Sequence, residues 1–496
     1  MTSENQGAAP EPAGPSPAGP TGTPLGVPAA VGTVSPSGSP TSPTPAPAAP
    51  IQAPPAAPIE APTAADRPAA DAPAPLTGDV TDVVRPDRSL WRDGDFLRFW
   101  GGQGVSQIGS SVGRIALPVL AVSVLDATAF QVGLLDAVQF AAFLLIGLPA
   151  GAWVDRWRKR RTMITADAVR AVAMLAIPVL WWTGSLDFWH LLAVAAVVGT
   201  ATVFFDVGYQ SFVPVLVPSG RVADANGKLE ATAQVARLGG PGIGGALLSV
   251  VSVPVLFVAE AVGYLVSALA LITVRDSERR PDPPHEASLI GQIRAGLSFV
   301  VRHPLISRIT AATGISNFFS TVAATLYPIL ILRELGLGAP AFGLIMSLGA
   351  IGGVLGAALA SRIGERVGEG TALPLSLVAS AVLMLLMPAA TLMPTPWLQI
   401  TAISIADFGF SVLVVVYNVL QVSMRQRVCP PPLLGRMNAS IRCLVWGVMP
   451  IGALLGGWLG GSIGIVPTIL IGIVGAGTAC LPLFFSPLWG MRRLPS

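Results

Sequence analysis

The sequence predicts an all-α membrane protein with twelve transmembrane helices in two six-helix bundles. The chain has 496 residues, of which 52% are hydrophobic and only 11% are charged. A soluble domain holds about 25% charged residues, so this chain is expected to be solvated mainly by lipid. Long apolar runs follow one another from Phe96 onward, and features of the first half recur 210 residues later. Such a repeat is typical of membrane proteins built from two related bundles.

Each apolar run is long enough to cross a membrane, because a helix needs about 20 residues to span the hydrocarbon core. The predicted spans lie near residues 96–125, 130–152, 162–184, 188–216, 228–250, 252–274, 304–332, 340–361, 370–392, 397–424, 435–462 and 465–488. An even number of spans places both ends of the chain on one side of the membrane.

Basic residues indicate which side that is. The connections after the even-numbered spans contain Arg and Lys, whereas the opposite connections contain none apart from Arg333. The richest connection is GAWVDRWRKRR, residues Gly151–Arg161, which we call the basic loop. Because connections rich in Lys and Arg stay in the cytoplasm, both termini are predicted to be cytoplasmic, in a bacterial plasma membrane.

Composition divides the chain into four parts. Residues 1–88 are nearly all Pro, Ala, Gly, Ser and Thr and are predicted to form a disordered cytoplasmic tail. The first bundle is predicted at 89–274 and the second at 304–496. The cytoplasmic linker 275–303 is predicted to contain an amphipathic helix, because apolar residues recur every four positions from Leu289 to Leu297.

The basic loop carries a family resemblance. It is similar to the Gly-x-x-x-Asp-Arg-x-Gly-Arg-Arg signature of the major facilitator superfamily, and SRIGERVGEG is a weaker second copy. The passage FFDVGYQSFVPVLVPSGRVADANGKLEATAQVARLGGPGIGG resembles the branch of macrolide-efflux and enterobactin-exporter proteins. The second glycine of the signature is missing from the Trp157-Arg158 turn, so we expect this turn to be made differently. The resemblance implies transport by alternating access, with spans one, four, seven and ten around a central cavity.

Charged residues inside the spans need a partner or a function, because each costs at least ~2.5 kcal/mol on insertion scales. Asp206 and Arg237 are predicted to lie at similar depth on consecutive helices. They form either a permanent ion pair or a pair that breaks when Asp206 takes a proton or a substrate cation. The resemblance places Arg114, Asp206 and Asp407 at the cavity. Asp407 has no evident charged neighbour in its half, which makes it the stronger candidate for a proton carrier.

The other charged residues in the spans receive simpler interpretations. Asp136 and Glu260 are expected to be structural or to face the extracellular side. Arg170 and Arg442 lie nearer the cytoplasmic ends, where their side chains can reach the interface. Polar and aromatic residues are predicted to line a roomy, amphipathic substrate cavity: Gln107, Asn317, Tyr327, Phe410 and Tyr417.

The basic loop and its second copy are predicted to form a conformational latch. The latch residues are Gly151, Asp155, Arg156, Arg158, Arg160, Glu365 and Arg366. Asp155 is expected to meet the positive N-terminal end of the eleventh span, near Gly435, and so to hold the outward-facing state.

These features predict a secondary active transporter, with proton-coupled efflux of amphipathic, antibiotic-like or siderophore-like molecules. An importer of the same fold and a non-transporting sensor that signals through the N-terminal tail remain open alternatives. The sequence lacks metalloprotease and phosphate-binding motifs, so we predict no enzyme, cofactor or metal site. The predicted partners are a small-molecule substrate, protons and the lipid bilayer, without nucleic acid, and the chain is predicted to be a monomer.

Overall fold

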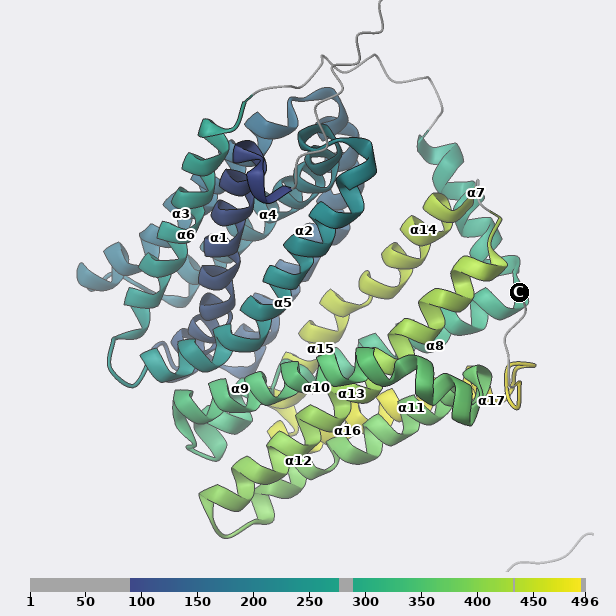
Figure 1. Cartoon of the computed structure of the whole chain (residues 1–496). Coiled ribbons are helices and arrows are strands. Elements are labelled where there is room, and N and C mark those ends of the chain that lie inside the picture. Colours follow the sequence, from purple (N-terminus) through teal and green to yellow (C-terminus); the bar gives the residue numbers. More distant parts are fainter. Residues whose placement is uncertain (1–89, 276–288, 431–432, 492–496) are drawn as a thin grey trace, which may run out of the picture. The chain divides into compact units, whose positions relative to one another are not determined.

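Helices account for the regular structure of the described residues. A computed structural model of the protein describes residues 90–275, 289–430 and 433–491, and no strand occurs among them (Figure 1). The predicted tail, residues 1–88, lies outside this part. Helices satisfy every backbone hydrogen bond within one segment, which is the condition for crossing lipid.

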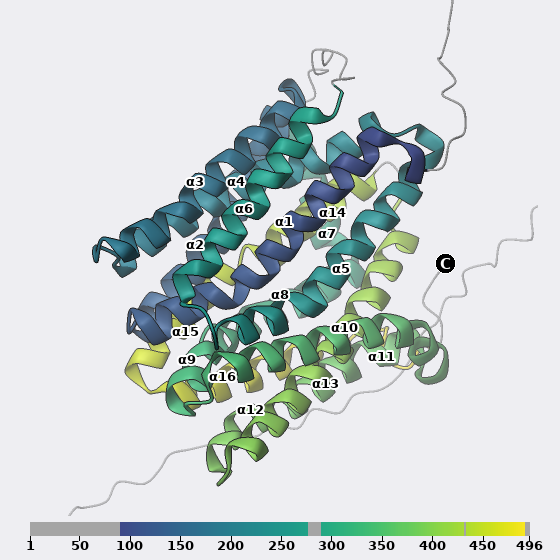
Figure 2. The same cartoon turned by 60° about the vertical axis from the view of Figure 1, so that its left-hand side comes forward.

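The first half of the chain forms six long helices. They are α1 (Gly94–Val119), α2 (Ala129–Arg156), α3 (Lys159–Trp182), α4 (Phe188–Leu216), α5 (Val222–Leu247) and α6 (Val253–Thr273). Helix α6 contacts both α1 and α3, and α3 also contacts α4 (Figure 2). Polar caps begin several helices, as where Thr128 and Gln131 form a capping box at the start of α2.

The second half follows α7 (Leu289–Arg302) and is more broken. Its helices are α8 (Pro304–Ala324), α9 (Tyr327–Ile329), α10 (Gly338–Val367), α11 (Glu369–Met384), α12 (Leu386–Ala389), α13 (Pro396–Val428), α14 (Leu434–Trp446), α15 (Met449–Ser462), α16 (Ile465–Gly477) and α17 (Leu481–Phe484). Helix α7 lies against α14, with Val300 in an apolar cluster that includes Met437 and Ile441.

Eleven helical stretches in the described residues are long and apolar enough to cross a membrane. They match the predicted spans except the fifth. Helix α5 is continuous over 26 residues but is not among the eleven, because glycines and Arg237 lower its hydropathy. It packs between α1 and α10, and a helix covered by protein needs less apolar surface of its own.

The two halves share local structure at the 210-residue offset. A π-helical turn ends the first span at Leu120–Val124, and another occurs at Leu330–Glu334 after α9. Arg98 donates from Nη1 to the carbonyl of Thr273 at 3.3 Å, and Arg308 donates to the carbonyl of Phe485 at 2.7 Å. Each arginine thus binds a free carbonyl at the end of the last long helical stretch of its own half.

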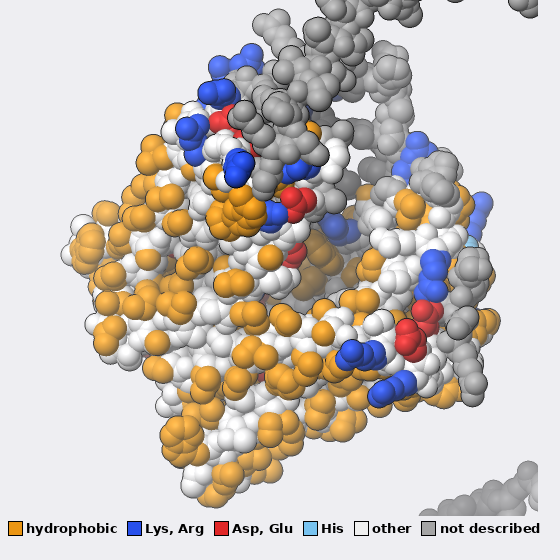
Figure 3. Space-filling model, viewed as in Figure 1, with side chains coloured by type: hydrophobic (Ala, Val, Ile, Leu, Met, Phe, Trp, Pro, Cys, Tyr) orange, Lys and Arg blue, Asp and Glu red, His pale blue; other side chains and the backbone are white. Residues whose placement is uncertain are grey.

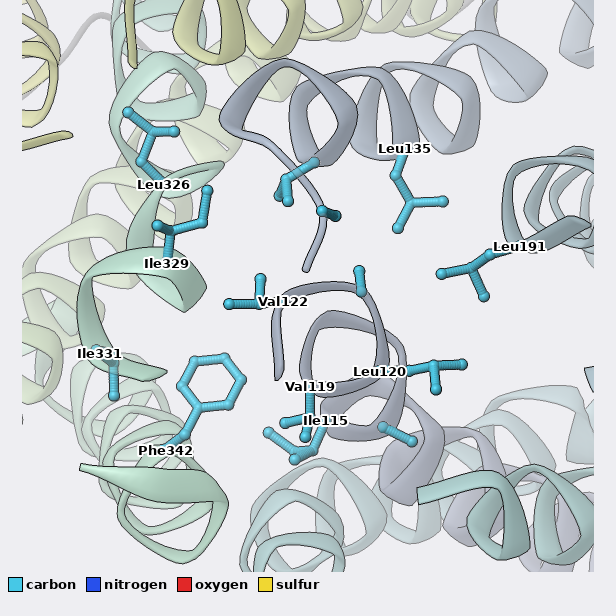
Figure 4. Close-up of a cluster of buried hydrophobic side chains, with 14 of the residues drawn as sticks. Ile115, Val119, Leu120, Val122, Leu135, Leu191, Leu326, Ile329, Ile331 and Phe342 are labelled. Carbon is cyan, nitrogen blue, oxygen red and sulfur yellow. The ribbon is translucent and has the colours of Figure 1, made fainter. Parts of the chain in front are cut away.

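The largest apolar cluster contains residues from both halves. Figure 4 shows side chains from α1 and the π-helical turn that follows it, among them Ile115 and Val122, beside Ile329, Ile331 and Phe342 of the second half. All five side chains are buried. This cluster therefore joins the two halves where their first long helices end.

Candidate functional site

A cavity of about 850 Å³ lies between the first and second halves of the chain. It is lined by α2, α8, α13 and α14 and by Met449 at the start of α15. The space-filling view shows a recess between the surfaces over α5 and α14 (Figure 3). Two arginines and six amides supply most of the polar lining, namely Arg425, Arg442, Gln139, Asn317, Asn418, Gln421, Gln426 and Asn438. Among the described residues, no Asp or Glu lines this cavity.

A second cavity of about 250 Å³ continues the first toward the end of α8. The two share Phe140, Asn317 and Met449. The smaller cavity ends at Asp136, whose Oδ2 accepts a hydrogen bond of 2.9 Å from the hydroxyl of Thr325. This bond crosses from one half of the chain to the other.

The end of the helices near Thr325 is closed by further contacts between the halves. Arg333 donates from Nη2 to the carbonyl of Val122 at 2.9 Å and lies 3.9 Å from the carboxylate of Asp126. The apolar cluster of Figure 4 adds Ile115 and Phe342 beside these contacts. We call this end the closed end and the end that carries the basic loop the basic end.

Glycine pairs bring helices of the two halves together. A Cβ on Gly133 of α2 would lie 2.9 Å from the Cα of Gly457 of α15, and a Cβ on Gly245 of α5 would lie 3.0 Å from the Cα of Gly343 of α10. Because any larger side chain would overlap the facing backbone, these positions require glycine. The two crossings are counterparts, since Gly133 and Gly343 match in the internal repeat.

The predicted cavity residues are distributed over several places. Asn317 lines the large cavity and donates to the carbonyl of Val445 at 3.2 Å. Tyr417 is buried behind the wall and shares a 2.7 Å hydrogen bond with Thr313. Tyr327 and Phe410 line a separate, narrow cavity. Gln107 is half-buried on α1 and lines none of these three cavities.

Asp407 lies where α13 crosses α10. Its carboxylate faces Gly349, and a Cβ at that glycine would overlap the carboxylate. Tyr327 is near enough to interact electrostatically with it. Among the described residues Asp407 takes part in no ion pair. It does not line the large cavity, so a proton on Asp407 would act at the α10–α13 crossing.

Arg170 is the centre of a buried polar cluster in the first half. It forms an ion pair with Asp167 on the same helix. Its guanidinium also lies over two rings, 4.1 Å from the centroid of Phe205 and 4.4 Å from that of Tyr264. Such contacts stabilise a cation that has lost its water. The side chain is only 5% exposed, so the expectation that Arg170 reaches the membrane interface is wrong.

Glu260 joins α6 to α1 within the same cluster. It accepts a 2.9 Å hydrogen bond from the hydroxyl of Tyr264, which in turn accepts one of 3.1 Å from Ser110. Its carboxylate lies against Gly113, where a Cβ would overlap it. Gln103 and Ser267 form another 2.9 Å hydrogen bond between α1 and α6.

The structure separates Asp206 from Arg237. Asp206 interacts electrostatically with Arg170, whereas Arg237 interacts with Arg114. No ion pair joins Asp206 to Arg237 within the described residues, and the cation whose charge acts on Asp206 is Arg170. Arg114 donates to Ser111 at 2.8 Å and also interacts with Glu260. The sequence reasoning missed the central place of Arg170 and Asp167, although their spacing of three residues on one helix was a usable signal.

Only two residues of the basic loop, Trp157 and Arg158, lie outside helices. Helix α2 ends at Arg156, Trp157 and Arg158 are extended, and α3 begins at Lys159. Trp157 has φ −100°, so no glycine is needed, and its ring stacks on Phe204 at 5.9 Å. Arg158, Arg161 and Phe204 also line an apolar groove between α3 and α4. The second copy is made differently, because Gly368 has φ +95°.

The predicted latch is only partly described. Arg160 donates to the carbonyls of Leu271 and Ile272 at the end of α6, at 2.8 and 2.6 Å. The side chains of Arg156, Glu365 and Arg366 are exposed. Gly151 and Asp155 lie within α2, but the side chain of Asp155 and the surroundings of Gly151 and Gly435 lie outside the described part of the structure.

Comparisons with known proteins agree with this architecture. Macrolide efflux protein A of Streptococcus pyogenes is 21% identical over 75% of this chain and 90% of its own length. Multidrug efflux pump Tap of Mycolicibacterium fortuitum is 26% identical over 74% of this chain and 91% of its own. Among solved structures, an inward-facing, occupied bacterial homologue of the human lysosomal transporter Spinster has a TM-score of 0.62 and 16% identity, over 80% of this chain and 97% of its own.

A second solved structure shares the fold. It is an inward-facing bacterial homologue of the iron transporter ferroportin, with a TM-score of 0.61 and 16% identity over 80% of this chain and 99% of its own. Residues 99–451 match the family description Major Facilitator Superfamily. The chain is therefore a multi-pass membrane protein and a transporter that belongs to the Major Facilitator Superfamily.

Proposed function

We propose that this transporter exports amphipathic small molecules across a bacterial plasma membrane in exchange for protons. The observation that carries the proposal is the cavity of about 850 Å³ near the basic end, together with the contacts that seal the closed end. A cavity reached from one side and sealed on the other is one half of an alternating-access cycle.

The direction of transport is taken from the relatives. Two of them, each matched over about 90% of its own length, are named efflux proteins, one for macrolides and one for many drugs. The large cavity combines amides and arginines with Phe140, Phe143 and Trp446. Apolar and polar groups on one wall suit an amphipathic molecule, such as an antibiotic or a siderophore.

In this proposal the basic end faces the cytoplasm, as the positive-inside rule requires. Helix α5 completes twelve spans in two six-helix bundles, and both termini are cytoplasmic. Residues 1–88 form the cytoplasmic tail, and 275–303 link the bundles. The protein acts as a monomer, because each cycle needs only the two halves of one chain.

Asp407 and Asp206 are the proposed proton carriers. A buried carboxylate that lacks a partner favours its neutral form, and Asp407 has no ion pair among the described residues. Asp206 has Arg170 as its electrostatic partner, so protonation of Asp206 would leave that arginine paired with Asp167 alone. Arg114 on α1 and Arg237 on α5 are the other proposed coupling residues, and their positive charges repel each other.

The basic loop and its second copy form the proposed latch at the cytoplasmic end. Arg160 ties α3 to the end of α6, and the turn at Gly368 has the equivalent position in the second half. Asp155 remains the proposed contact for the start of α14.

Transport by everted membrane vesicles tests this function. Vesicles that contain the protein should accumulate a radiolabelled amphipathic antibiotic or siderophore when the lumen is acidic, and should release luminal protons as they do so. Asp407→Asn should abolish proton-linked uptake, and Asp206→Asn should reduce it at least 10-fold. Glu334→Gln, a change of an exposed carboxylate, is the matched control. Uptake that is unaffected by both aspartate variants would remove these residues from the mechanism.

A further inference from the structure

We infer that the large cavity binds an anionic amphipath, with Arg425 as the residue that binds the acidic group. This inference rests on the proposed function, because it takes the cavity to be the substrate site. It names the charge of the substrate, which neither the fold nor the relatives specify.

Two buried polar atoms in the cavity wall lack partners. The Arg425 side chain is 8% exposed in total, and its Nε has no hydrogen-bond partner among the described residues. Gln421 is 4% exposed, one helical turn earlier on α13, and its Oε1 also has no partner. Buried polar atoms in folded proteins are nearly always hydrogen-bonded, so these two atoms on one cavity wall are available to a bound molecule.

The chemistry of these two atoms restricts that ligand. An arginine Nε only donates hydrogen bonds, and a glutamine Oε1 only accepts them. A ligand that serves both atoms carries an acidic group beside an N–H or O–H group. The guanidinium recognises carboxylate, sulfonate and phosphate oxygens, which it can bind through two parallel hydrogen bonds.

The rest of the wall favours the same sign of charge. Arg442 supplies a second cation, with its guanidinium 5.2 Å from the centre of the Trp446 ring. Among the described residues, no Asp or Glu lines the large cavity, and Asp136 lies at the far end of the smaller one, bonded to Thr325. Within the described lining of the large cavity, a cationic ligand would meet two positive charges and no carboxylate. An anion gains from both, because the interaction between charges is strong where little water remains.

The apolar part of the ligand has a place beside these arginines. Phe143 and Trp446 form an edge-to-face pair with centroids 6.0 Å apart, one from each half of the chain. Val422 and Ile441 line the same cavity. A flat aromatic or alkyl body would lie on these side chains while its acidic group reaches Arg425.

Two fluorescent probes of one scaffold test the inference. Anilinonaphthalene sulfonate carries a sulfonate, and N-phenyl-1-naphthylamine is its neutral counterpart. Each is titrated into the full-length protein in nanodiscs of zwitterionic lipid, with empty nanodiscs as the blank. We expect Arg425→Gln to raise the Kd for the sulfonate at least 10-fold and to leave the Kd for the neutral probe within 2-fold. Arg425→Lys should keep part of the affinity, and Arg362→Gln, an exposed arginine on α10, should change neither value.

A second variant keeps the test decisive if Arg425→Gln fails to fold. Gln421→Glu places a carboxylate one turn from Arg425 and should also raise the Kd for the sulfonate probe at least 10-fold. The inference is wrong if neither variant changes the sulfonate Kd, or if the Kd values of both probes rise equally. If phosphatidylglycerol in the nanodisc abolishes binding of the sulfonate probe, the site binds a lipid headgroup. The inference of a soluble anionic substrate would then be wrong. Binding through Arg425 without any proton-driven flux would support this inference and contradict only the proposed transport.

Discussion

The carboxylate of Asp136 on α2 accepts a 2.9 Å hydrogen bond from the hydroxyl of Thr325, a residue 189 positions later, at the end of α8. Thr325 is 1% exposed, and the bond lies where the smaller cavity ends. A second bond of similar length joins Arg333 to the carbonyl of Val122 nearby. The halves of the chain are therefore joined at the closed end by directed polar contacts as well as by apolar packing.

Loss of the Thr325 hydroxyl should open the closed end. Thr325→Val keeps the shape of the side chain but removes a hydrogen bond to a charged group, worth about 1.5–3 kcal/mol, so the open state should gain at least 10-fold in population. A cysteine at Val122, whose side chain is buried at the closed end, in a protein without its three native cysteines, should then react faster with a water-soluble maleimide. Thr325→Ser is the control and should react as the parent does. An unchanged rate in Thr325→Val would show that this bond does not hold the closed end.

Removal of the buried guanidinium of Arg170 should destabilise the first half. Arg170→Gln leaves the carboxylate of Asp167 buried without its cation, which costs about 3–5 kcal/mol. Thermal unfolding of the purified protein measures the loss. The double variant Asp167→Asn with Arg170→Gln should recover much of it, because no unpaired charge remains. If both variants unfold like the parent, the cluster contributes nothing to stability.

Added bulk at Gly113 should disturb the α1–α6 contact. The new methyl group of Gly113→Ala would overlap the carboxylate of Glu260, and overpacking of this kind typically costs about 1–3 kcal/mol. Gly314→Ala, a position with nothing within 4 Å, is the matched control in the second half. The shorter side chain of Glu260→Asp should relieve the overlap in a double variant. Equal melting temperatures for Gly113→Ala and Gly314→Ala would contradict the close approach.

The turn at Gly368 should require its glycine, whereas a glycine at Trp157 should weaken the turn of the basic loop. Gly368→Ala forces a side chain into φ +95° and should destabilise the protein by roughly 1–3 kcal/mol. Trp157→Gly removes the ring that stacks on Phe204 and Trp153, so it should also destabilise the protein. The comparison uses melting temperatures of the two variants. A stabilising Trp157→Gly would show that the turn prefers glycine after all.

Apolar runs and the internal repeat allowed much of the fold to be predicted. Eleven of the predicted spans correspond to helices of spanning length, and the repeat is visible in the matched π-helical turns at Leu120 and Leu330. Helix α5 shows the limit of the hydropathy signal. Its glycines serve close packing against α10, as at Gly245, and this same feature makes the helix less apolar than its neighbours.

The partners of the charged residues could not be predicted in the same way. Position along a helix gives the depth of a residue, but not the direction in which its side chain points or which helix lies beside it. Asp206 and Arg237 are on consecutive helices, yet α4 lies chiefly against α2 and α3, whereas α5 lies against α1 and α10. Arg170 on α3 therefore becomes the neighbour of Asp206. Arg425 directly follows the tenth predicted span, and burial of its side chain depends on how α13 and α14 pack, which the sequence alone does not give.

Paired distances measured by electron–electron double resonance test alternating access most directly. One spin-label pair at Arg156 and Arg366 reports on the basic end, and another at Ser123 and Glu334 reports on the closed end; all four side chains are exposed. When pH is lowered or a transported molecule is added, the distance at the closed end should lengthen while that at the basic end shortens. Distances that stay fixed, or that change in the same direction, under conditions that support transport would contradict the account.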